Sequence, residues 1–212
     1  MCKMKITLER KLITYSDLWR TSEVLLEKAK AEPQGSYYLI LGSLTFSSFA
    51  LEAFLNHLGE NIFASWIDLE SISPRAKLNV ICERIKIKPS WGVQPWQVVP
   101  EIVGFRNKIA HGKNSLLKFE DIVPEDKYDE ALHQFLYADW QEFATEKNAS
   151  DVRVALEKLF KLLHQAADID GDHLFHHGAQ TGTEGAFRDD AHSPASNQWL
   201  EHSIIDEHRL AQ

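Results

Sequence analysis

The part of the chain that most constrains the fold is the stretch SYYLILGSLTFSSFALEAFLNHLGENIF at residues 36–63. At helical spacing it is apolar on almost every side, which is typical of the central, buried helix of a bundle. One polar line runs along it, because Thr45, Ser48, Glu52 and Asn56 recur at intervals of three and four. An unpaired buried carboxylate is costly, so the line is expected to meet polar partners from neighbouring helices.

Further helices are predicted on both sides of this stretch. The first begins at Ser16 as its N-cap and ends near Ala31. Another begins at Ser73-Pro74, where a capping residue precedes a proline at the first helical position. The predicted segments after residue 63 are 74–87, from Pro95 to the end of FRNKIAH, 127–144 and 150–168.

The predicted fold is therefore all-α, an up-and-down bundle of four to six helices over residues 15–168. The N-terminal segment, residues 1–14, is ambiguous, and its alternation of Met4, Ile6 and Leu8 indicates a short strand.

The last part of the chain, residues 169–212, differs in composition from the predicted bundle. It is rich in glycine, histidine and acidic residues, and we expect a largely irregular, polar extension that does not contribute to the core. A short helix at 198–210 is the one regular element predicted within it.

The charge of the chain is unevenly distributed. The formal net charge is −8, which argues against generic, charge-driven binding to nucleic acid. Residues 169–212 carry eight acidic residues against Arg188 and Arg209, so most of the negative charge lies outside the predicted bundle. A local basic patch on the nearly neutral bundle is therefore compatible with the composition.

Targeting and redox features of the sequence are few. The start MCKMKITLERK has no apolar core of a secretory signal, and no apolar run approaches the ~20 residues of a membrane span. Two cysteines, Cys2 and Cys82, make no disulfide framework. We expect a cytoplasmic protein with two free thiols and no membrane partner.

The segment FRNKIAHGKN, residues 105–114, places an arginine and a histidine at the end of an apolar helix. With Arg106 at 0° and about 100° per residue, Arg106 lies inside the apolar arc, Asn107 falls at about 100° and His111 at about 140°. Apolar residues fill that arc: Val98, Val99, Ile102, Val103, Phe105, Ile109 and Ala110. A buried guanidinium keeps its charge and needs a carboxylate, for which Glu52 is the obvious partner.

These residues resemble the HEPN domain family, helical bundles whose signature is an arginine followed after four to six residues by a histidine. The segment RNKIAH at 106–111 fits this signature, as do the polar Asn107 and the glycine after the histidine. The central SFALEAFLNHL at 48–58 and the basic helix between the two segments are also similar to that family. The resemblance covers about residues 15–165.

The resemblance implies a homodimer in which the Arg-His motifs of two chains face one cleft. Many family members are metal-independent endoribonucleases of toxin or defence systems, and some of these act with an antitoxin or another regulatory protein. It implies that His111 is the general acid or base, that Arg106 stabilises the phosphorane and that Asn107 positions phosphate or histidine. Lys113 stands where one toxin subgroup has a tyrosine, so the chain departs from that subgroup.

Other interpretations of these residues stay open. The chain could be a non-catalytic HEPN module that binds RNA, a nucleotide or a partner protein, or a purely structural dimerisation domain. Arg106 could only tie its helix to Glu52, and His111 could only cap the helix end. Glu52 and Asn56 are expected to support the site rather than to react.

Basic residues near the motif are candidates for RNA contact, although such residues usually form a solvated helix face. They are Arg75, Lys77, Arg84, Lys86, Lys108 and Lys113. His173 and His177 have the spacing of a metal-binding pair on a helix, but no cysteine or acid pattern completes a site. We therefore expect no metal and no cofactor.

Overall fold

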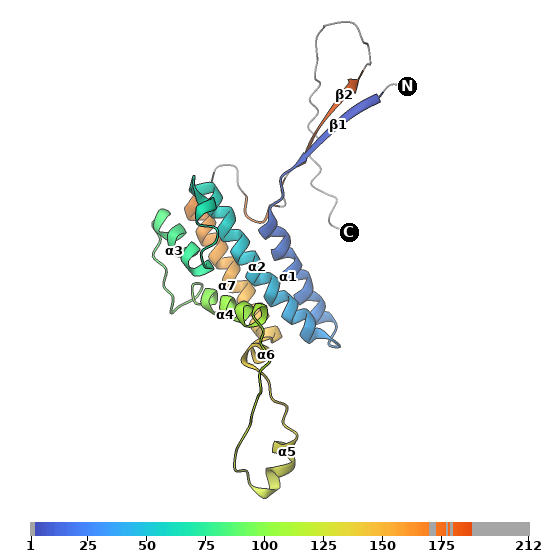
Figure 1. Ribbon diagram of the computed structural model, residues 1–212, viewed down its shortest axis with the longest axis vertical. Helices are drawn as coiled ribbons and strands as arrows, with labels where there is room; N and C mark the ends of the chain where they lie inside the picture. The colour runs from blue at the N-terminus through green and yellow to red at the C-terminus, as the bar shows by residue number, and fades with distance from the viewer. Residues whose placement is uncertain (1–2, 170–172, 177, 179, 188–212) are drawn as a thin grey trace. The chain divides into compact units, whose positions relative to one another are not determined.

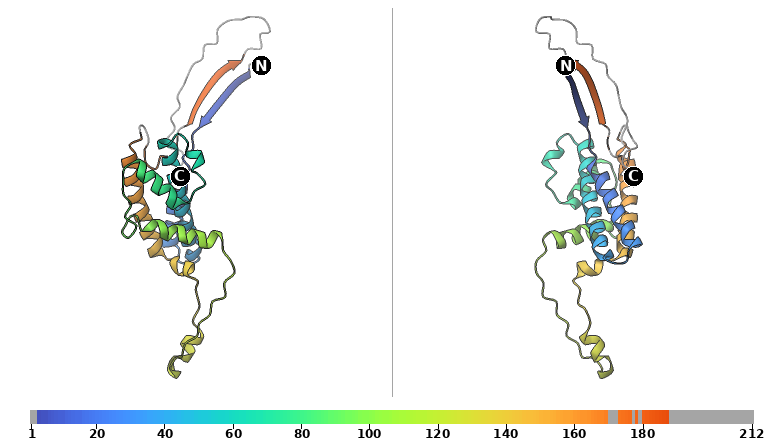
Figure 2. Two further views of the ribbon diagram at one scale, coloured as in Figure 1. Left: turned by 60° about the vertical axis from the view of Figure 1, so that its left-hand side comes forward. Right: turned by 90° about the vertical axis from the view of Figure 1, so that its right-hand side faces the viewer.

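The computed structural model describes residues 3–169, 173–176, 178 and 180–187 (Figures 1 and 2). The chain divides into two units, one formed by Thr14–Phe175 and the other by its two terminal segments. The larger unit is helical, and the described residues of the smaller unit form a two-stranded antiparallel sheet. The predominantly helical architecture predicted from the sequence is confirmed.

Seven α-helices follow one another in the described part of the larger unit. Their bounds are α1 Thr14–Ala31, α2 Ser36–Ile62, α3 Pro74–Arg84, α4 Val98–Ala110, α5 Tyr128–Leu132, α6 Asp139–Phe143 and α7 Glu146–Ala167. Two single 3₁₀ turns, Trp66–Asp68 and Glu125–Lys127, lie between them. The helices predicted at 36–63, 74–87 and 150–168 are confirmed, with ends that shift by a few residues.

The central helix is α2, as its composition predicts. It packs against α1, α3, α4 and α7, and its side chains Leu44, Leu51, Leu55 and Leu58 are fully buried. By length and hydropathy alone α2 could also cross a membrane, which differs from the expectation that no apolar run approaches this length. About 50% of its most apolar window is buried inside the helical unit, so this is weak evidence for a membrane span.

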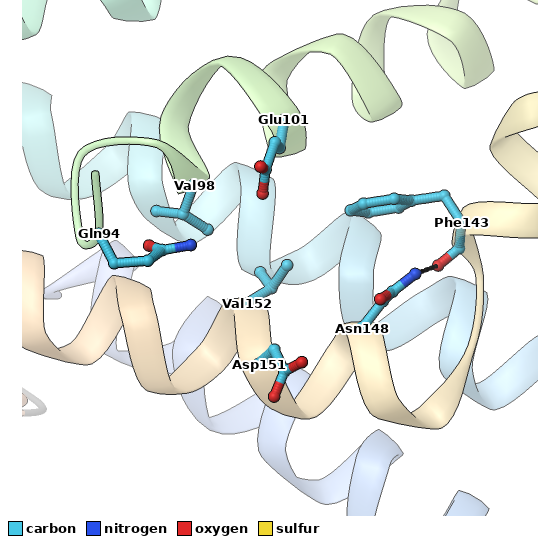
Figure 3. Close-up of a pocket in the computed structure, with 7 residues that line it drawn as sticks. All are labelled: Gln94, Val98, Glu101, Phe143, Asn148, Asp151 and Val152. Atoms are coloured by element: carbon cyan, nitrogen blue, oxygen red, sulfur yellow. Dashed lines mark hydrogen bonds between the residues drawn. The ribbon is translucent and has the colours of Figure 1, made fainter. Parts of the chain in front are cut away.

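The helix α4 packs against α6 and α7. The rings of Phe105 in α4 and Phe143 in α6 lie 5.2 Å apart, and Lys108 Nζ lies 2.8 Å from Asp139 Oδ2. At the start of α7, Asn148 Nδ2 donates to the carbonyl of Phe143 at 2.9 Å (Figure 3). These contacts fix the helix that carries the Arg-His segment.

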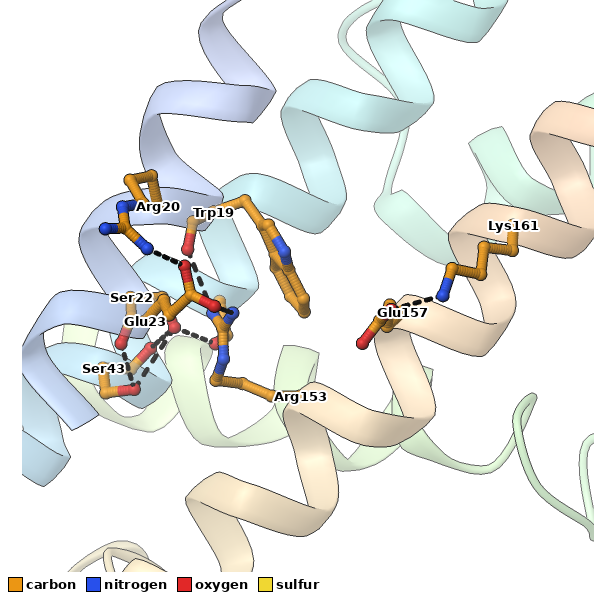
Figure 4. A network of polar contacts seen from close by, with 9 residues as sticks. Trp19, Arg20, Ser22, Glu23, Ser43, Arg153, Glu157 and Lys161 are labelled. Carbon is orange, nitrogen blue, oxygen red and sulfur yellow. Dashed lines mark hydrogen bonds and ion pairs between the residues drawn. The ribbon is translucent and has the colours of Figure 1, made fainter. Parts of the chain in front are cut away.

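A buried cluster of serines joins α1 to α2. Ser22 Oγ lies 2.6 Å from Ser47 Oγ and 2.9 Å from the carbonyl of Ser43, and Ser43 Oγ donates to the carbonyl of Ser22 at 2.8 Å (Figure 4). Small side chains let the two helices approach closely, while the hydrogen bonds satisfy the hydroxyls that this approach buries. The pairing of α1 with α2 is consequently polar at its centre, although both helices are apolar around it.

Two boundaries predicted inside the bundle are wrong. The first helix begins at Thr14, and Ser16 is not its N-cap but a buried residue of its first turn. The single helix predicted at 127–144 is replaced by the short α5 and α6 with residues 133–138 between them. Leu132 is 64% exposed and Phe135 is 71% exposed, so no packing stabilises a longer helix there, and short unpacked helices are marginal in water.

The smaller unit contains the strand predicted near the N-terminus. The strand β1, Lys3–Arg10, pairs with β2, Gln180–Phe187, in a register that joins Lys3 to Phe187 and Arg10 to Gln180. The prediction of irregular structure after residue 169 is therefore wrong over 180–187. The segment 180–187 contains two glycines, which are depleted in strands, and its pairing partner lies near the other end of the chain. The local sequence therefore did not predict a strand. The helix predicted at 198–210 lies outside the described residues.

The helical unit extends beyond the boundary predicted at residue 168. The ring of Phe175 stacks on Trp19 at 5.6 Å with an interplanar angle of 11°, and its backbone N–H donates to the Tyr15 hydroxyl at 3.0 Å. Arg153 covers Trp19 with its guanidinium carbon 3.9 Å from the ring centroid. Part of the polar extension thus packs on the bundle, because the ring of Phe175 packs against an aromatic side chain of the helical unit.

Loss of this contact should be measurable. We expect Phe175→Ala to lower the free energy of unfolding by roughly 1–3 kcal/mol, less than for a fully buried phenylalanine because Phe175 is half-buried. Thermal unfolding followed by circular dichroism measures the loss. The control Ile67→Ala removes a side chain that is 77% exposed and should leave the midpoint unchanged. Equal midpoints for both variants would show that the Phe175 stack contributes nothing.

The thiol of Cys82 should be chemically silent in the folded protein. Burial raises the pKa of Cys82 to about 12, and the thiolate is the reactive form. In a Cys2→Ser variant, whose remaining thiol is Cys82, we expect no reaction with an aromatic disulfide reagent at pH 8. Full reaction should follow in denaturant, and rapid reaction without denaturant would contradict the burial of this side chain.

Candidate functional site

The centre of the candidate site is the carboxylate of Glu52 on α2. Its Oε1 accepts from Lys77 Nζ of α3 at 3.3 Å, and its Oε2 accepts from Arg106 Nη2 of α4. The side chains are 1% exposed for Lys77, 22% for Arg106 and 30% for Glu52. The predicted pairing of Glu52 with Arg106 is confirmed, and one carboxylate joins three helices.

The start of α3 determines where Lys77 points. Ser73 caps the helix by accepting from the N–H of Ala76 at 3.3 Å, and Pro74 occupies the first turn. Lys77 then shares the inner face of α3 with Leu78 and Ile81, both fully buried. The prediction of Lys77 as an RNA contact is therefore wrong, because its ammonium is enclosed and paired with Glu52.

The exposed end of α4 carries the three residues of the motif. Arg106 Nη1 donates to Asn107 Oδ1 at 3.0 Å, so Arg106 contacts both Glu52 and Asn107. His111 is the C-cap residue, and its backbone N–H donates to the carbonyl of Asn107 at 3.0 Å. The side chains of Asn107 and His111 are exposed. Among the described residues, no hydrogen bond joins the His111 ring to Arg106 or to any other group.

The polar line on α2 has two halves with different roles. Thr45 and Ser48 donate to carbonyls of their own helix, those of Leu41 at 2.8 Å and Thr45 at 2.7 Å. Glu52 instead reaches α3 and α4. Asn56, one turn further, has a buried Oδ1 without a hydrogen-bond partner in the described part of the chain. Asn56 therefore lies beside the ion cluster in sequence but is not joined to it.

The remaining basic residues that were predicted to contact RNA differ in their exposure and in whether they contact other groups of the chain. Arg75, Arg84, Lys86 and Lys113 are exposed. Arg75 lies over the ring of Trp91 at 4.7 Å, and Arg84 Nε donates to the carbonyl of Ile62 at 3.4 Å. Lys108 is paired with Asp139 and, by its hydrogen bond and charge, lowers the pKa of that carboxyl group.

A small cavity of about 140 Å³ lies between α4, α6 and α7, away from the motif (Figure 3). Its lining residues are Gln94, Val98, Glu101, Phe143, Asn148, Asp151 and Val152. Both acidic groups already have partners, since Glu101 accepts from Gln97 at 2.8 Å and Asp151 accepts from Lys147 at 2.6 Å. No motif in the sequence predicts this cavity, and its lining includes none of the predicted site residues.

Metal-binding groups are a separate question. The described residues contain no cluster of three or more histidine, cysteine or acidic side chains that could hold an ion. Of the predicted histidine pair, His173 is exposed and His177 lies outside the described residues.

The position of Lys77 at the centre of the site differs from the solvated position expected for it. A signal was present, because Pro74, Lys77, Leu78 and Ile81 recur at helical spacing and mark one face. A lysine in phase with buried residues indicates an enclosed ammonium. The neighbouring basic residues from 75 to 88 mask that signal, because together they are typical of one solvated helix face.

Known proteins offer no further guide to this site. No protein-family model, no curated protein and no solved structure matches the chain. The interpretation of the site consequently depends on its geometry and on the resemblance of residues 106–112 to the HEPN motif.

Removal of the central carboxylate should destabilise the bundle. We expect Glu52→Ala to cost roughly 2–4 kcal/mol, because it leaves two cations without their partner, and its partial exposure keeps the cost below that of a fully buried pair. Chemical denaturation measures the change. Glu60→Ala removes an exposed carboxylate from the same helix and should have little effect. A stable Glu52→Ala protein would show that the ion cluster does not hold the three helices together.

Proposed function

We propose that this chain is a HEPN-like, metal-independent endoribonuclease that acts in the cytoplasm as a homodimer. Arg106 and His111 of the two copies would form its composite site. The observation that carries the proposal is the arrangement at the end of α4. Arg106 is anchored by Glu52 yet 22% exposed, beside an exposed Asn107 and an exposed His111.

The environment of Arg106 suits a group that binds phosphate. A guanidinium has five N–H donors, and Glu52 and Asn107 each accept from one terminal nitrogen, so donors remain for phosphate oxygens. Lys77 and Arg106 together exceed the charge of Glu52 by one unit, which favours a developing negative charge. Because Glu52 fixes the guanidinium before substrate arrives, little reorganisation is required in the transition state.

The role proposed for His111 is proton transfer. Histidine exchanges protons near neutral pH, and the ring at this helix end is open to a ribose hydroxyl. Attack by the 2′-hydroxyl requires a base, and departure of the 5′-oxygen requires an acid. One protomer supplies a single histidine in this motif, so a second copy would supply the other. Cleavage by this route leaves a 2′,3′-cyclic phosphate.

The second candidate is a non-catalytic module that binds RNA, a nucleotide or a protein. It is favoured by the hydrogen bonds of Arg106, which join it to Glu52 and Asn107 and, among the described residues, not to the His111 ring. In that case the exposed Arg75, Arg84, Lys86 and Lys113 would bind phosphate without cleaving it. A role as a toxin or defence effector, with an antitoxin or regulatory partner, belongs to the first candidate and has no separate support.

A histidine substitution distinguishes enzyme from binder. We expect His111→Ala to lower RNA cleavage by about 10²–10⁴-fold, because the general acid or base is lost. RNA affinity should change little, since one histidine at the edge adds little to phosphate binding. The assay uses purified protein, several single-stranded RNAs and excess chelator, with gel analysis of the cleaved ends.

Two controls make this assay decisive. His173→Ala removes an exposed histidine outside the motif and should cleave like the unmodified protein. DNA of the same sequence should stay whole, because it lacks the 2′-hydroxyl. RNA that is bound but never cut, or that the His111→Ala protein cuts equally well, would exclude the ribonuclease and leave the binding module.

A further inference from the structure

The segment between α4 and α6 carries an unusual amount of uncovered apolar surface. Residues 113–138, which we name the arm, contain eight exposed large apolar side chains. They are Leu116 (81% exposed), Leu117, Phe119, Ile122 (99%), Tyr128, Leu132, Phe135 (71%) and Tyr137. Soluble monomers rarely expose so many together, and loops of this length are usually functional or disordered.

The arm is attached to the bundle only at its base. Its two ends are held together by the Lys108–Asp139 ion pair at 2.8 Å and by the contact of Phe105 with Phe143. Figure 1 shows the chain running out from α4, through α5, and back to α6. Within the arm, Phe135 and Tyr137 contact each other with ring centroids 4.9 Å apart and stay exposed. The arm's own bundle therefore does not cover these side chains.

A second uncovered apolar surface lies on α2. Tyr38 is 75% exposed, Phe49 is 39% exposed, and the ring of Phe46 lies 6.2 Å from that of Phe49. At about 100° per residue Tyr38, Phe46 and Phe49 fall on the side of α2 opposite its buried leucines, and Glu52 lies at the edge of that side. We name Tyr38, Phe46 and Phe49 the α2 face.

We propose that the arm of one copy packs on the α2 face of a second copy, and that the exchange is reciprocal. The inference rests on the proposed homodimer and names the surfaces that form it. One chain carries both surfaces, so a two-fold symmetric pair uses each of them twice. The arm carries six acidic residues against three lysines, which makes a nucleic acid an unsuitable occupant of this surface.

The area available fits a stable pair. Eight partly exposed side chains at about 100 Å² each give roughly 800 Å² per arm, and two arms reach the ~1,600 Å² of a standard interface. The placement also fits the proposed reaction. The arm begins directly after His111 and Gly112, and Phe49 of the α2 face lies three residues before Glu52, which accepts a hydrogen bond from Arg106. Docking would therefore bring His111 of one copy toward Arg106 of the other.

Oligomeric mass tests this proposal on the full chain. Analytical ultracentrifugation should give twice the chain mass of 24.3 kDa for the unmodified protein. The arm variant Ile122→Asp/Phe135→Asp and the face variant Tyr38→Asp should both be monomers with unchanged helical circular dichroism. These side chains are exposed in the single chain, so the substitutions leave its core intact. Val154→Asp changes a residue of α7 that is 53% exposed and should stay dimeric.

Several results would overturn the proposal. A dimer that survives the arm variant places the interface elsewhere, and an unmodified protein that is monomeric at all concentrations excludes the exchange. If the unmodified protein is instead a monomer that co-floats with phospholipid vesicles, and Tyr38→Asp abolishes this co-flotation, the α2 face binds a membrane. RNA cleavage separates the two proposals. Cleavage by a dimer that does not use the arm supports the enzyme alone, and an arm-dependent dimer without cleavage supports the interface alone.

Discussion

The carboxylate of Glu52 is the interaction on which this side of the bundle depends. It lies between the ammonium of Lys77 and the guanidinium of Arg106, so it joins α2, α3 and α4 at one point. Neither α3 nor α4 is long enough to be stable alone in water, and each gains its position by packing on α2. Glu52 makes that packing directional, because a charge in a partly dry setting tolerates few alternative arrangements.

On the opposite side of the bundle the helices meet through hydroxyl groups, aromatic rings and an ion pair, that of Arg153 with Glu23. There α1 and α2 meet through hydrogen-bonded serines, and the ring of Phe54 lies 4.3 Å from that of Phe160 in α7. Arg153 is mostly buried, yet it contacts the face of Trp19, the carbonyl of Trp19 and Glu23 (Figure 4). The bundle thus combines a well-packed scaffold with a charged, partly open edge, a division that suits a site requiring both rigidity and access.

The sequence predicted the elements whose residues carry their own signal. An all-round apolar composition identified α2, and a charge inside an apolar arc identified the contact of Arg106 with Glu52. The sequence did not predict the elements whose structure depends on contacts with another segment of the chain. Residues 127–144 contain enough apolar residues for a helix, but Leu132 and Phe135 stay exposed, and residues 180–187 pair with a strand near the other end of the chain. The helical periodicity predicts Asn107 and His111 at the edge of the core, and in the structure their side chains are exposed.

The pairing of β1 with β2 has a consequence for the order in which the protein acquires its structure. Lys3–Arg10 is synthesised before all seven described helices, whereas Gln180–Phe187 follows only after them. Ile6 and Leu8 therefore have no strand partner while the helical unit is being translated. A chaperone that recognises extended apolar segments would therefore have a long time to bind the β1 segment before its partner strand is made.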